Sequence, residues 1–369
     1  MKKYIWQNSE YPNFTYDKDV IMPLLSSVRL KQGMLLGRMQ SIGFENSQHA
    51  KLNVLTEDVI KSSEIEGLKL NAEQVRSSIA RRLGLDVGGD IYVERDVQGI
   101  VDMMLDATIN FDKPVTEDRL FGWQSAMFPS GRSGLYKIKV GEYRDDEKGK
   151  MQVVSGAIGH EKVHYEAPGA DIVPREMNRL IEYINNESDT DLVIKAGIVH
   201  LWFVIIHPFE DGNGRIARAL TDMLLARSEN SSDRFYSMSS QIKKVRKSYY
   251  DILQITQKDS VDITLWLKWF LENLVTAIDN SEELLNDVLK RAEFWEKNKA
   301  QVFNDRQIKV LKKILDNGGK FEGNLTTKKW AAICNCSHDT ANRDIADLIS
   351  KNVLIKQGEA RATHFVLSI

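Results

Sequence analysis

The feature that most constrains this chain of 369 residues is an apolar run that ends at a histidine-proline pair. Residues 192–206 are almost wholly apolar and contain too few turn residues to be several strands, which favours one buried helix. Pro208 disfavours helical geometry at the residue before it, so this helix should end at His207. The sequence therefore predicts a buried central helix with an imidazole at its carboxyl end.

A loop rich in glycine follows this histidine over residues 210–214, and a second helix is predicted over residues 215–227. Backbone N–H groups that converge at a helix amino end, together with the helix dipole, favour a bound anion. Arg215 and Arg218 lie three residues apart in the first turn, and guanidinium groups suit phosphate oxygens. Asp211 beside them is a hard oxygen ligand of the type that Mg²⁺ prefers.

Residues 207–218 combine a general base, a carboxylate, an anion-binding turn and two arginines. This combination indicates phosphoryl or nucleotidyl transfer. An alternative stays open on the residues alone. Loops commonly collect Asp, Gly and Asn, so the same stretch also suits a structural turn in which a histidine ends a helix and Asn213 caps the loop.

The residues from His207 to Arg218 resemble the motif of the Fic (filamentation induced by cyclic AMP) family, His-x-Phe-x-(Asp/Glu)-Gly-Asn-(Gly/Lys)-Arg-x-x-Arg, at every specified position. The resemblance implies transfer of AMP from ATP to a hydroxyl side chain of a target protein. By the same resemblance His207 takes the hydroxyl proton, Asp211 holds Mg²⁺, Gly212, Asn213, Gly214 and Arg215 bind phosphate, and Arg218 holds the γ-phosphate.

The resemblance also implies an inhibitory element near the amino terminus. Within a helix predicted over residues 51–66, Ser62, Glu66 and the following Gly67 resemble the family's (Ser/Thr)-x-x-x-Glu-(Gly/Asn) pattern. Glu66 would then pair with Arg218 and repel the γ-phosphate, so that ATP binds only in an unproductive pose. Without the resemblance, the same residues suit a solvated charged turn.

Residues 151–167 carry the pattern of a β-hairpin, with β-branched residues around turn glycines. The family has a flap at this place that holds an extended target segment by main-chain hydrogen bonds. Gly159, His160 and Val163 are the candidate clamp residues. His160 and His164 are interpreted as a surface pair, not as a metal site.

Tyr249, Tyr250 and His200 each have two interpretations. The tyrosines lie on a helix predicted over residues 241–257 and resemble the pair that lines the family's adenine pocket, but adjacent tyrosines also suit ordinary half-buried packing. His200 stands seven residues before His207 without a Glu at metalloprotease spacing. We therefore predict a core histidine hydrogen-bonded to backbone.

Composition describes an ordinary globular protein, with a net charge of −2 and 42% hydrophobic residues, so no overall basic field attracts nucleic acid or anionic lipid. Cys334 and Cys336 are too close for a disulfide and too few for a zinc site. The amino terminus has no apolar signal core, and Lys195 and His200 interrupt the apolar run at 192–206. We expect a cytoplasmic protein without a membrane partner.

The carboxyl-terminal stretch is predicted to form a winged helix, with helices over residues 308–315, 326–333 and 339–351 and two strands around Gly358. Residues that would face duplex DNA are Ser337, His338, Thr340, Asn342, Arg343, Lys356 and Arg361. Three acids on the third helix, Asp339, Asp344 and Asp347, would repel phosphate backbone. Protein docking or dimer formation is therefore preferred, and DNA binding is the alternative.

The patterns predict an all-α protein with a small β-hairpin and a carboxyl-terminal winged-helix domain, and the resemblance implies that the core is of the Fic type and that the hairpin is its flap. The expected domains are 1–110 with the inhibitory helix, 111–290 as catalytic core and 300–369 as winged helix. The expected reaction is attack of a Ser, Thr or Tyr hydroxyl on the α-phosphorus of Mg·ATP, which releases pyrophosphate. A homodimer is an expectation of the resemblance.

Three alternatives to this function stay open. In the first, Glu66 activates water to remove AMP from the target. In the second, the chain transfers another phosphate-containing group, as relatives of this fold do. The third alternative is a winged-helix regulator that binds nucleotide only as a ligand.

Overall fold

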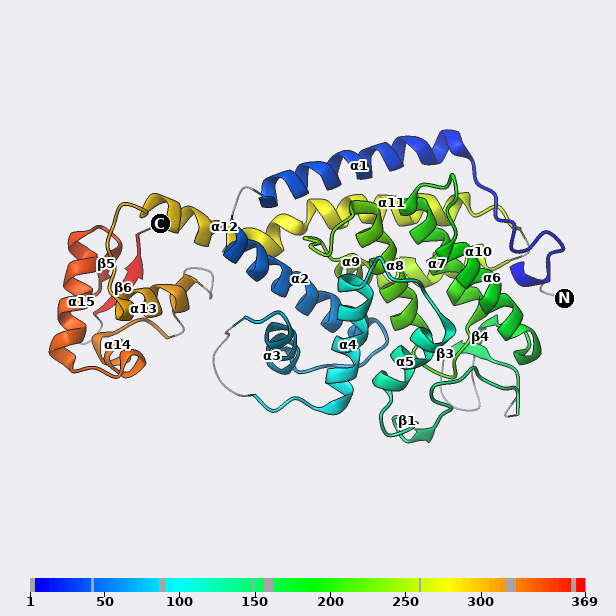
Figure 1. Cartoon of the computed structure of the whole chain (residues 1–369), viewed down its shortest axis with the longest axis horizontal. Helices are drawn as coiled ribbons and strands as arrows, with labels where there is room; N and C mark the ends of the chain where they lie inside the picture. Colours follow the sequence, from blue (N-terminus) through cyan, green and yellow to red (C-terminus); the bar gives the residue numbers. More distant parts are fainter. Residues whose placement is uncertain are drawn as a thin grey trace. The chain divides into compact units, whose positions relative to one another are not determined.

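The structure is a computed structural model that describes residues 4–40, 43–85, 91–147, 149–155, 162–258, 260–315, 321, 323–359 and 363–368. The chain divides into two compact units, the first made of residues 1–36 and 51–281 and the second of residues 37–50 and 282–369. Figure 1 shows that helices dominate the chain, with only short strands. The predicted all-α class with small hairpins is confirmed.

Helices joined by loops and two small antiparallel hairpins make up the first unit, and α1 and α2 run on into residues of the second unit. Its α-helices are α1 (Lys18–Gln40), α2 (Phe44–Ile65), α3 (Ala72–Arg82), α4 (Arg95–Ile109), α5 (Glu117–Met127), α6 (Val173–Asn185), α7 (Leu192–Ile206), α8 (Asn213–Glu229), α9 (Met238–Lys244), α10 (Arg246–Thr256) and α11 (Thr264–Asp279). The shorter elements are η1 (Ile5–Gln7), β1 (Arg132–Ser133), β2 (Tyr136–Lys137), β3 (Gln152–Ser155), β4 (Lys162–Glu166) and η2 (Ala170–Ile172).

The predicted central helix is α7, whose bounds agree with the sequence pattern at both ends. Asp191 caps its start by accepting a hydrogen bond from the Val193 N–H at 2.8 Å. Every residue from Val193 to Ile206 is buried, and α7 packs most extensively against α8. The interior of this unit therefore holds the two helices that flank the candidate site (Figure 1).

Three predicted helices have different bounds in the structure. α2 begins at Phe44, seven residues before the predicted start, because residues 44–50 lack the apolar repeat that marked the rest. α8 begins at Asn213 and ends at Glu229, outside the predicted 215–227. The predicted helix over 241–257 is two helices, α9 and α10, because Val245 leaves the helical conformation at φ −110° and ψ 30°.

After the helix α12 (Ser281–Lys297), the second unit has the predicted order of three helices and a terminal hairpin. These elements are α13 (Asp305–Leu315), α14 (Thr327–Cys334), α15 (His338–Ser350), β5 (Leu354–Gln357) and β6 (His364–Leu367). Trp330, Leu348 and Val310 lie in its apolar core. Its assignment as a winged helix stays a prediction, as does the division of the first unit at residue 110.

The acids of α15 do not all face outward as expected. Asp344 is buried and accepts hydrogen bonds from Arg306 at 2.7 Å and Asn304 at 3.0 Å. Asp347 accepts from Gln307 at 2.7 Å and from Lys351 at 2.6 Å. Asp344 is therefore paired inside the unit, whereas the Asp347 side chain is 44% exposed beside Lys351, and the effect of these acids on DNA binding stays a prediction.

No helix of the described residues is both long and apolar enough to cross a membrane.

Candidate active site

His207 lies where the central helix ends. α7 stops at Ile206, and His207 adopts the left-handed conformation, with φ 52° and ψ 59°, which non-glycine residues rarely take. Its N–H donates to the Phe203 carbonyl at 2.9 Å, and its carbonyl accepts from Nε of Arg144 at 2.8 Å. Both peptide groups of His207 are therefore held, and the side chain leaves the helix end in a fixed direction.

The imidazole of His207 is half-buried. Its Nδ1 lies 3.3 Å from the Val204 carbonyl, and because a carbonyl only accepts, this bond requires the proton on Nδ1. Removal from water is the main reason that the pKa of His207 falls to about 4. The ring is then neutral at pH 7, and Nε2 carries the free lone pair of a general base.

The loop between α7 and α8 is closed by Asn213. Its Oδ1 accepts from the Phe209 N–H at 3.0 Å, and its Nδ2 donates to the Phe209 carbonyl at 2.7 Å. Gly212 has φ 91°, and a Cβ there would lie 2.9 Å from the Met127 side chain. The side chain of Asn213 is thus committed to the loop, and the backbone N–H groups that open α8 are left for an anion.

Both predicted arginines are buried at the start of α8. Arg215 is 5% exposed and lies over the ring of Phe128, 5.0 Å from its centroid, whereas Arg218 is 2% exposed. Among the described residues, Nε of Arg215 and Nη1 of Arg218 have no hydrogen-bond partner. Buried donors without a partner are costly, so these groups are suited to receive the oxygens of an anion.

The predicted pair between Glu66 and Arg218 is present. Nη2 of Arg218 donates to Oε1 of Glu66 at 2.7 Å and to the Ser62 carbonyl at 2.9 Å, and Nε donates to Oγ of Ser62 at 2.8 Å. Burial acts to lower the pKa of Arg218, but the Glu66 charge outweighs it and the pKa is raised. α2 ends at Ile65, and Gly67 takes φ 85°, the left-handed conformation expected just after a helix.

Gly214 leaves space for the Glu66 carboxylate because it has no Cβ. A Cβ at position 214 would lie 2.1 Å from Oε1 of Glu66 and 3.1 Å from Nη1 of Arg218. Any other residue at this position would therefore have to displace the carboxylate. Gly214, which is expected to bind phosphate, is therefore also in contact with the Glu66 carboxylate.

Asp211 is held by a residue that the sequence did not single out. Its Oδ2 accepts from the hydroxyl of Ser133, and its Oδ1 accepts from the Gly212 N–H at 2.5 Å. Nη2 of Arg215 lies 3.8 Å from Oδ1, beyond hydrogen-bonding distance. The only sequence signal for Ser133 was its place in a glycine-rich loop, between Gly131 and Gly134.

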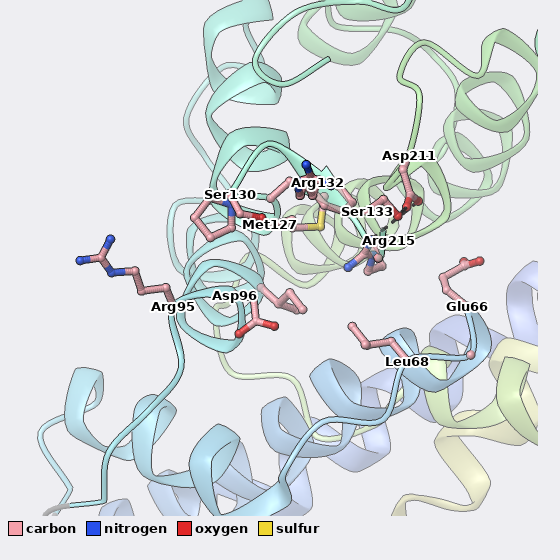
Figure 2. A pocket seen from close by; sticks show the side chains of 15 residues that line it. Glu66, Leu68, Arg95, Asp96, Met127, Ser130, Arg132, Ser133, Asp211 and Arg215 are labelled. Carbon is pink, nitrogen blue, oxygen red and sulfur yellow. Dashed lines mark hydrogen bonds and ion pairs between the residues drawn. The ribbon is translucent and has the colours of Figure 1, made fainter. Parts of the chain in front are cut away.

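A cavity of about 830 Å³ is lined in part by Glu66, Asp211 and Arg215. Figure 2 shows Asp211, Ser133 and Arg215 on one side of it, and Glu66 and Leu68 from the end of α2 on another. The Asp211 side chain is 40% exposed. The described residues contain no cluster of three or more His, Cys, Asp or Glu that would enclose a metal ion. A single open carboxylate fits Mg²⁺ that also binds substrate phosphates.

The two tyrosines differ in their surroundings. Tyr249 is buried, and its hydroxyl lies 2.8 Å from Nε2 of His200, whose Nδ1 lies 2.9 Å from Oγ1 of Thr221. Tyr250 is half-exposed, with the Arg246 guanidinium over its ring. The prediction that His200 bonds to backbone was wrong, because two side-chain hydroxyls occupy both ring nitrogens. Burial lowers the pKa of His200 to about 3.

The predicted hairpin is formed by β3 and β4, with Val154 paired to Val163. Both of these side chains are exposed. Tyr165 anchors β4, since its buried hydroxyl donates to the Ile205 carbonyl at 2.7 Å, one residue before the end of α7. Of the candidate clamp residues only Val163 is described, and Gly159 and His160 lie outside the described residues.

A second ionic contact of α2 also escaped the sequence reading. Asp58, two turns before Glu66, is buried with Arg234 and with Asp222 of α8. Arg234 lies 2.6 Å from Oδ1 of Asp222 and 3.4 Å from Oδ2 of Asp58, and the Ser237 hydroxyl donates to Oδ1 of Asp58. Acids in a charged helix give no sequence signal that they are buried.

The model of the Fic/DOC family matches residues 114–225. This stretch contains His207, Asp211 and both arginines of the motif. A second model, described as a domain of unknown function (DUF4172), matches residues 4–85, which include Glu66.

Curated relatives of this domain are named protein adenylyltransferases. One from Drosophila mojavensis is 26% identical over 219 residues, which are 58% of this chain and 39% of that protein. A probable protein adenylyltransferase of Aquifex aeolicus is 29% identical over 94 residues, 26% of this chain and 29% of that protein. This chain therefore spans well under half the length of these relatives.

Solved structures share the fold. A Fic family protein from Desulfovibrio desulfuricans superposes with a TM-score of 0.55 and 19% identity, covering 94% of this chain and 95% of that one. A Fic domain containing signaling protein from Bacteroides thetaiotaomicron gives a TM-score of 0.50 and 21% identity, covering 71% and 98%. At these identities the likeness concerns the fold alone.

Proposed function

We propose that this chain is a protein adenylyltransferase that transfers AMP from ATP to a Ser, Thr or Tyr hydroxyl of a target protein. The Fic/DOC domain and the names of its relatives support this class of reaction. The observation that carries it is the pair of buried guanidinium groups at the amino end of α8, which keep nitrogens without partners among the described residues. A polyphosphate supplies the oxygens that such donors need.

His207 acts as the general base. Its Nε2 takes the proton of the target hydroxyl while the hydroxyl oxygen bonds to the α-phosphorus and the bond to the β-phosphate oxygen breaks. Pyrophosphate leaves, and AMP stays on the target. Because the pKa of His207 is about 4, its base form is present throughout the neutral range.

The remaining motif residues bind the nucleotide. The backbone N–H groups of Asn213 and Gly214 and the guanidinium of Arg215 donate to phosphate oxygens, and Arg218 binds the γ-phosphate, while Gly212 forms the turn and its N–H donates to Asp211. Asp211 would hold Mg²⁺, which when bound neutralises charge on the phosphates. Tyr249 and Tyr250, whose ring centroids lie 5.2 Å apart, line the adenine side, where Tyr250 offers the exposed ring.

Glu66 inhibits this reaction. Its carboxylate already occupies Nη2 of Arg218 and rests against Gly214, so the γ-phosphate meets a negative charge where it needs a positive one. This contact is the arrangement that inhibits transfer. Release of Glu66 opens the site without any change in His207 or the loop.

Labelling with ATP tests this function. Glu66→Gly should raise AMP transfer by roughly tenfold or more, the effect of about 1.4 kcal/mol. His207→Ala in the Glu66→Gly background should lower it roughly 100-fold or more. Glu64→Gly is the matched control, because Glu64 lies in the same turn but pairs with Lys61 and Lys243 and should leave labelling at the wild-type level.

The position of the label separates the reactions that this fold is able to carry. Label on the α-phosphate should remain on protein and label on the γ-phosphate should not. Retention of the γ-label on protein would show that the chain transfers a phosphoryl group and not AMP. If the Glu66→Gly protein gives no more label than the His207→Ala variant, with itself or a cell lysate as target, the proposed function is wrong.

A further inference from the structure

The loop between α5 and β3 contacts the Fic motif at several points besides the bond from Arg144 to the His207 carbonyl. The Phe128 ring lies under Arg215 and would contact a Cβ at Gly212. The Lys139 N–H donates to Oε2 of Glu210 at 3.2 Å. Between these points the Ser133 hydroxyl donates to Oδ2 of Asp211. This loop therefore contributes to the site.

Ser133 is held in place by its own turn. β1 pairs with β2 across Gly134 and Leu135, and Gly134 has φ 55°. The Ile138 N–H closes the loop on the Gly131 carbonyl at 3.1 Å, and Arg132 donates to the Leu135 carbonyl at 2.8 Å. The Ser133 hydroxyl is thus presented to Asp211 from a backbone with few degrees of freedom.

Asp211 has a competing partner. Nη2 of Arg215 lies 3.8 Å from its Oδ1, an ion pair without a hydrogen bond, and a small rotation of the carboxylate would turn it into a hydrogen-bonded pair. Such a pair would consume the carboxylate oxygen that Mg²⁺ needs and the guanidinium that phosphate needs. The bonds from Ser133 to Oδ2 and from the Gly212 N–H to Oδ1 oppose this rotation, and they leave one lone pair free on each oxygen.

We propose that Ser133 is a positioning residue for the metal carboxylate: its hydroxyl holds Asp211 apart from Arg215, so that one binds a divalent cation while the other binds phosphate. This inference rests on the proposed function, since it assumes that Asp211 binds Mg²⁺. Residues that orient a metal ligand typically change metal affinity by about 10- to 100-fold when removed.

The test measures Mn²⁺ binding by electron paramagnetic resonance, with a non-hydrolysable ATP analogue, in the full-length Glu66→Gly protein. Ser133→Ala should weaken Mn²⁺ binding roughly 10- to 100-fold. Ser133→Thr keeps the hydroxyl and should restore most of the affinity. Ser130→Ala is the matched control, because Ser130 lines the same cavity without a bond to Asp211 and should leave affinity unchanged.

Activity provides a second readout. Ser133→Ala should need a higher Mg²⁺ concentration for half-maximal AMP transfer and should approach the Glu66→Gly rate when Mg²⁺ is saturating. The pH dependence set by His207 should not move. A merely structural role would instead lower the rate at every Mg²⁺ concentration.

Asp211→Asn separates failure of this inference from failure of the proposed function. If Asp211→Asn weakens Mn²⁺ binding and Ser133→Ala binds as tightly as Ser130→Ala, the role of Ser133 is wrong and the function stands. If Asp211→Asn binds Mn²⁺ as the parent does, Asp211 is not the metal ligand, and both proposals lose their metal site.

Discussion

Two ionic contacts join α2 to the body of the first unit, and they differ in their access to water. Asp58, Ser62 and Glu66 follow one another at intervals of four residues, so they share one face of the helix end. At Asp58 every charged partner is buried, with Arg234 only 4% exposed. At Glu66 the arginine is buried, but the carboxylate is 33% exposed and borders the cavity.

We call Asp58 the anchor, because its ion pairs are buried, and Glu66 the switch, because its carboxylate reaches water. Breaking a buried ion pair strands a charge in a medium that solvates it poorly, whereas a carboxylate that reaches water loses little when it leaves its partner. Glu66 also lies beyond the last helical residue, Ile65, next to the left-handed Gly67. We therefore expect Glu66 to move away from Arg218 while Asp58 keeps the helix in place.

Removal of the buried guanidinium should have the largest effect. Arg234→Met leaves Asp58 and Asp222 buried without their cation, which should cost about 3–5 kcal/mol of unfolding free energy. The urea midpoint, followed by circular dichroism, measures the loss. Arg218→Met is the comparison variant and should cost less than half as much, because water reaches the Glu66 that it leaves behind. Equal midpoints for the two variants would refute the distinction.

The anchor should also make stability depend on pH. Burial, and next the Asp222 charge, hold the pKa of Asp58 well above its usual value of 3.8, although Arg234 opposes them. The folded protein thus binds this proton more tightly than the unfolded chain does. The stabilisation is complete below 3.8 and is lost as the pH rises through the raised folded pKa.

Asp58→Asn should reduce this dependence, because the amide does not titrate while Asp222, whose pKa is also raised by burial, remains. In melting temperatures measured from pH 4 to pH 8, the wild type should lose stability relative to the variant as the pH rises. Glu64→Gln is the control, because it lies on the same helix, keeps the Asp58 carboxyl and pairs with Lys61. Parallel curves for wild type and Asp58→Asn would mean that Asp58 does not hold a proton in the folded protein.

At the switch, loss of charge should change activity more than stability. Glu66→Gln keeps the size of the side chain but removes its charge, which should release about 1–2 kcal/mol of inhibition, or roughly 5- to 30-fold in AMP transfer. The urea midpoint should stay close to that of the wild type. A variant that loses stability without gaining activity would make Glu66 a second anchor.

Local chemistry explains why much of the site was predictable. Pro208 ends α7, Asn213 closes the loop on Phe209, and Gly67 follows α2, each through bonds within a few residues. The motif likewise lies within one turn and one loop, so its pattern is visible in the sequence. The resemblance then pointed to the contact between Glu66 and Arg218, which local chemistry alone does not give.

What the sequence did not predict depends on contacts between distant segments. Ser133 and Asp211 are 78 residues apart, and Asp58 and Arg234 are 176 apart. A serine in a glycine-rich loop and an acid in a charged helix both have the composition of exposed residues. The burial of Asp344 has no local signal for the same reason, since its partner Arg306 comes from another helix.

The smallest expected effect is at Ser62, which stands between anchor and switch. Ser62→Ala removes the hydroxyl that accepts from Nε of Arg218, while the Ser62 carbonyl and Glu66 still accept from Nη2. Loss of one such bond should raise AMP transfer by roughly 2- to 5-fold, from about 0.5–1 kcal/mol. Ser63→Ala is the matched control, because that buried hydroxyl donates within α2 to the Val59 carbonyl. If Ser62→Ala releases as much activity as Glu66→Gln, the hydroxyl and the carboxylate act as one unit, and the switch extends a full turn closer to Asp58.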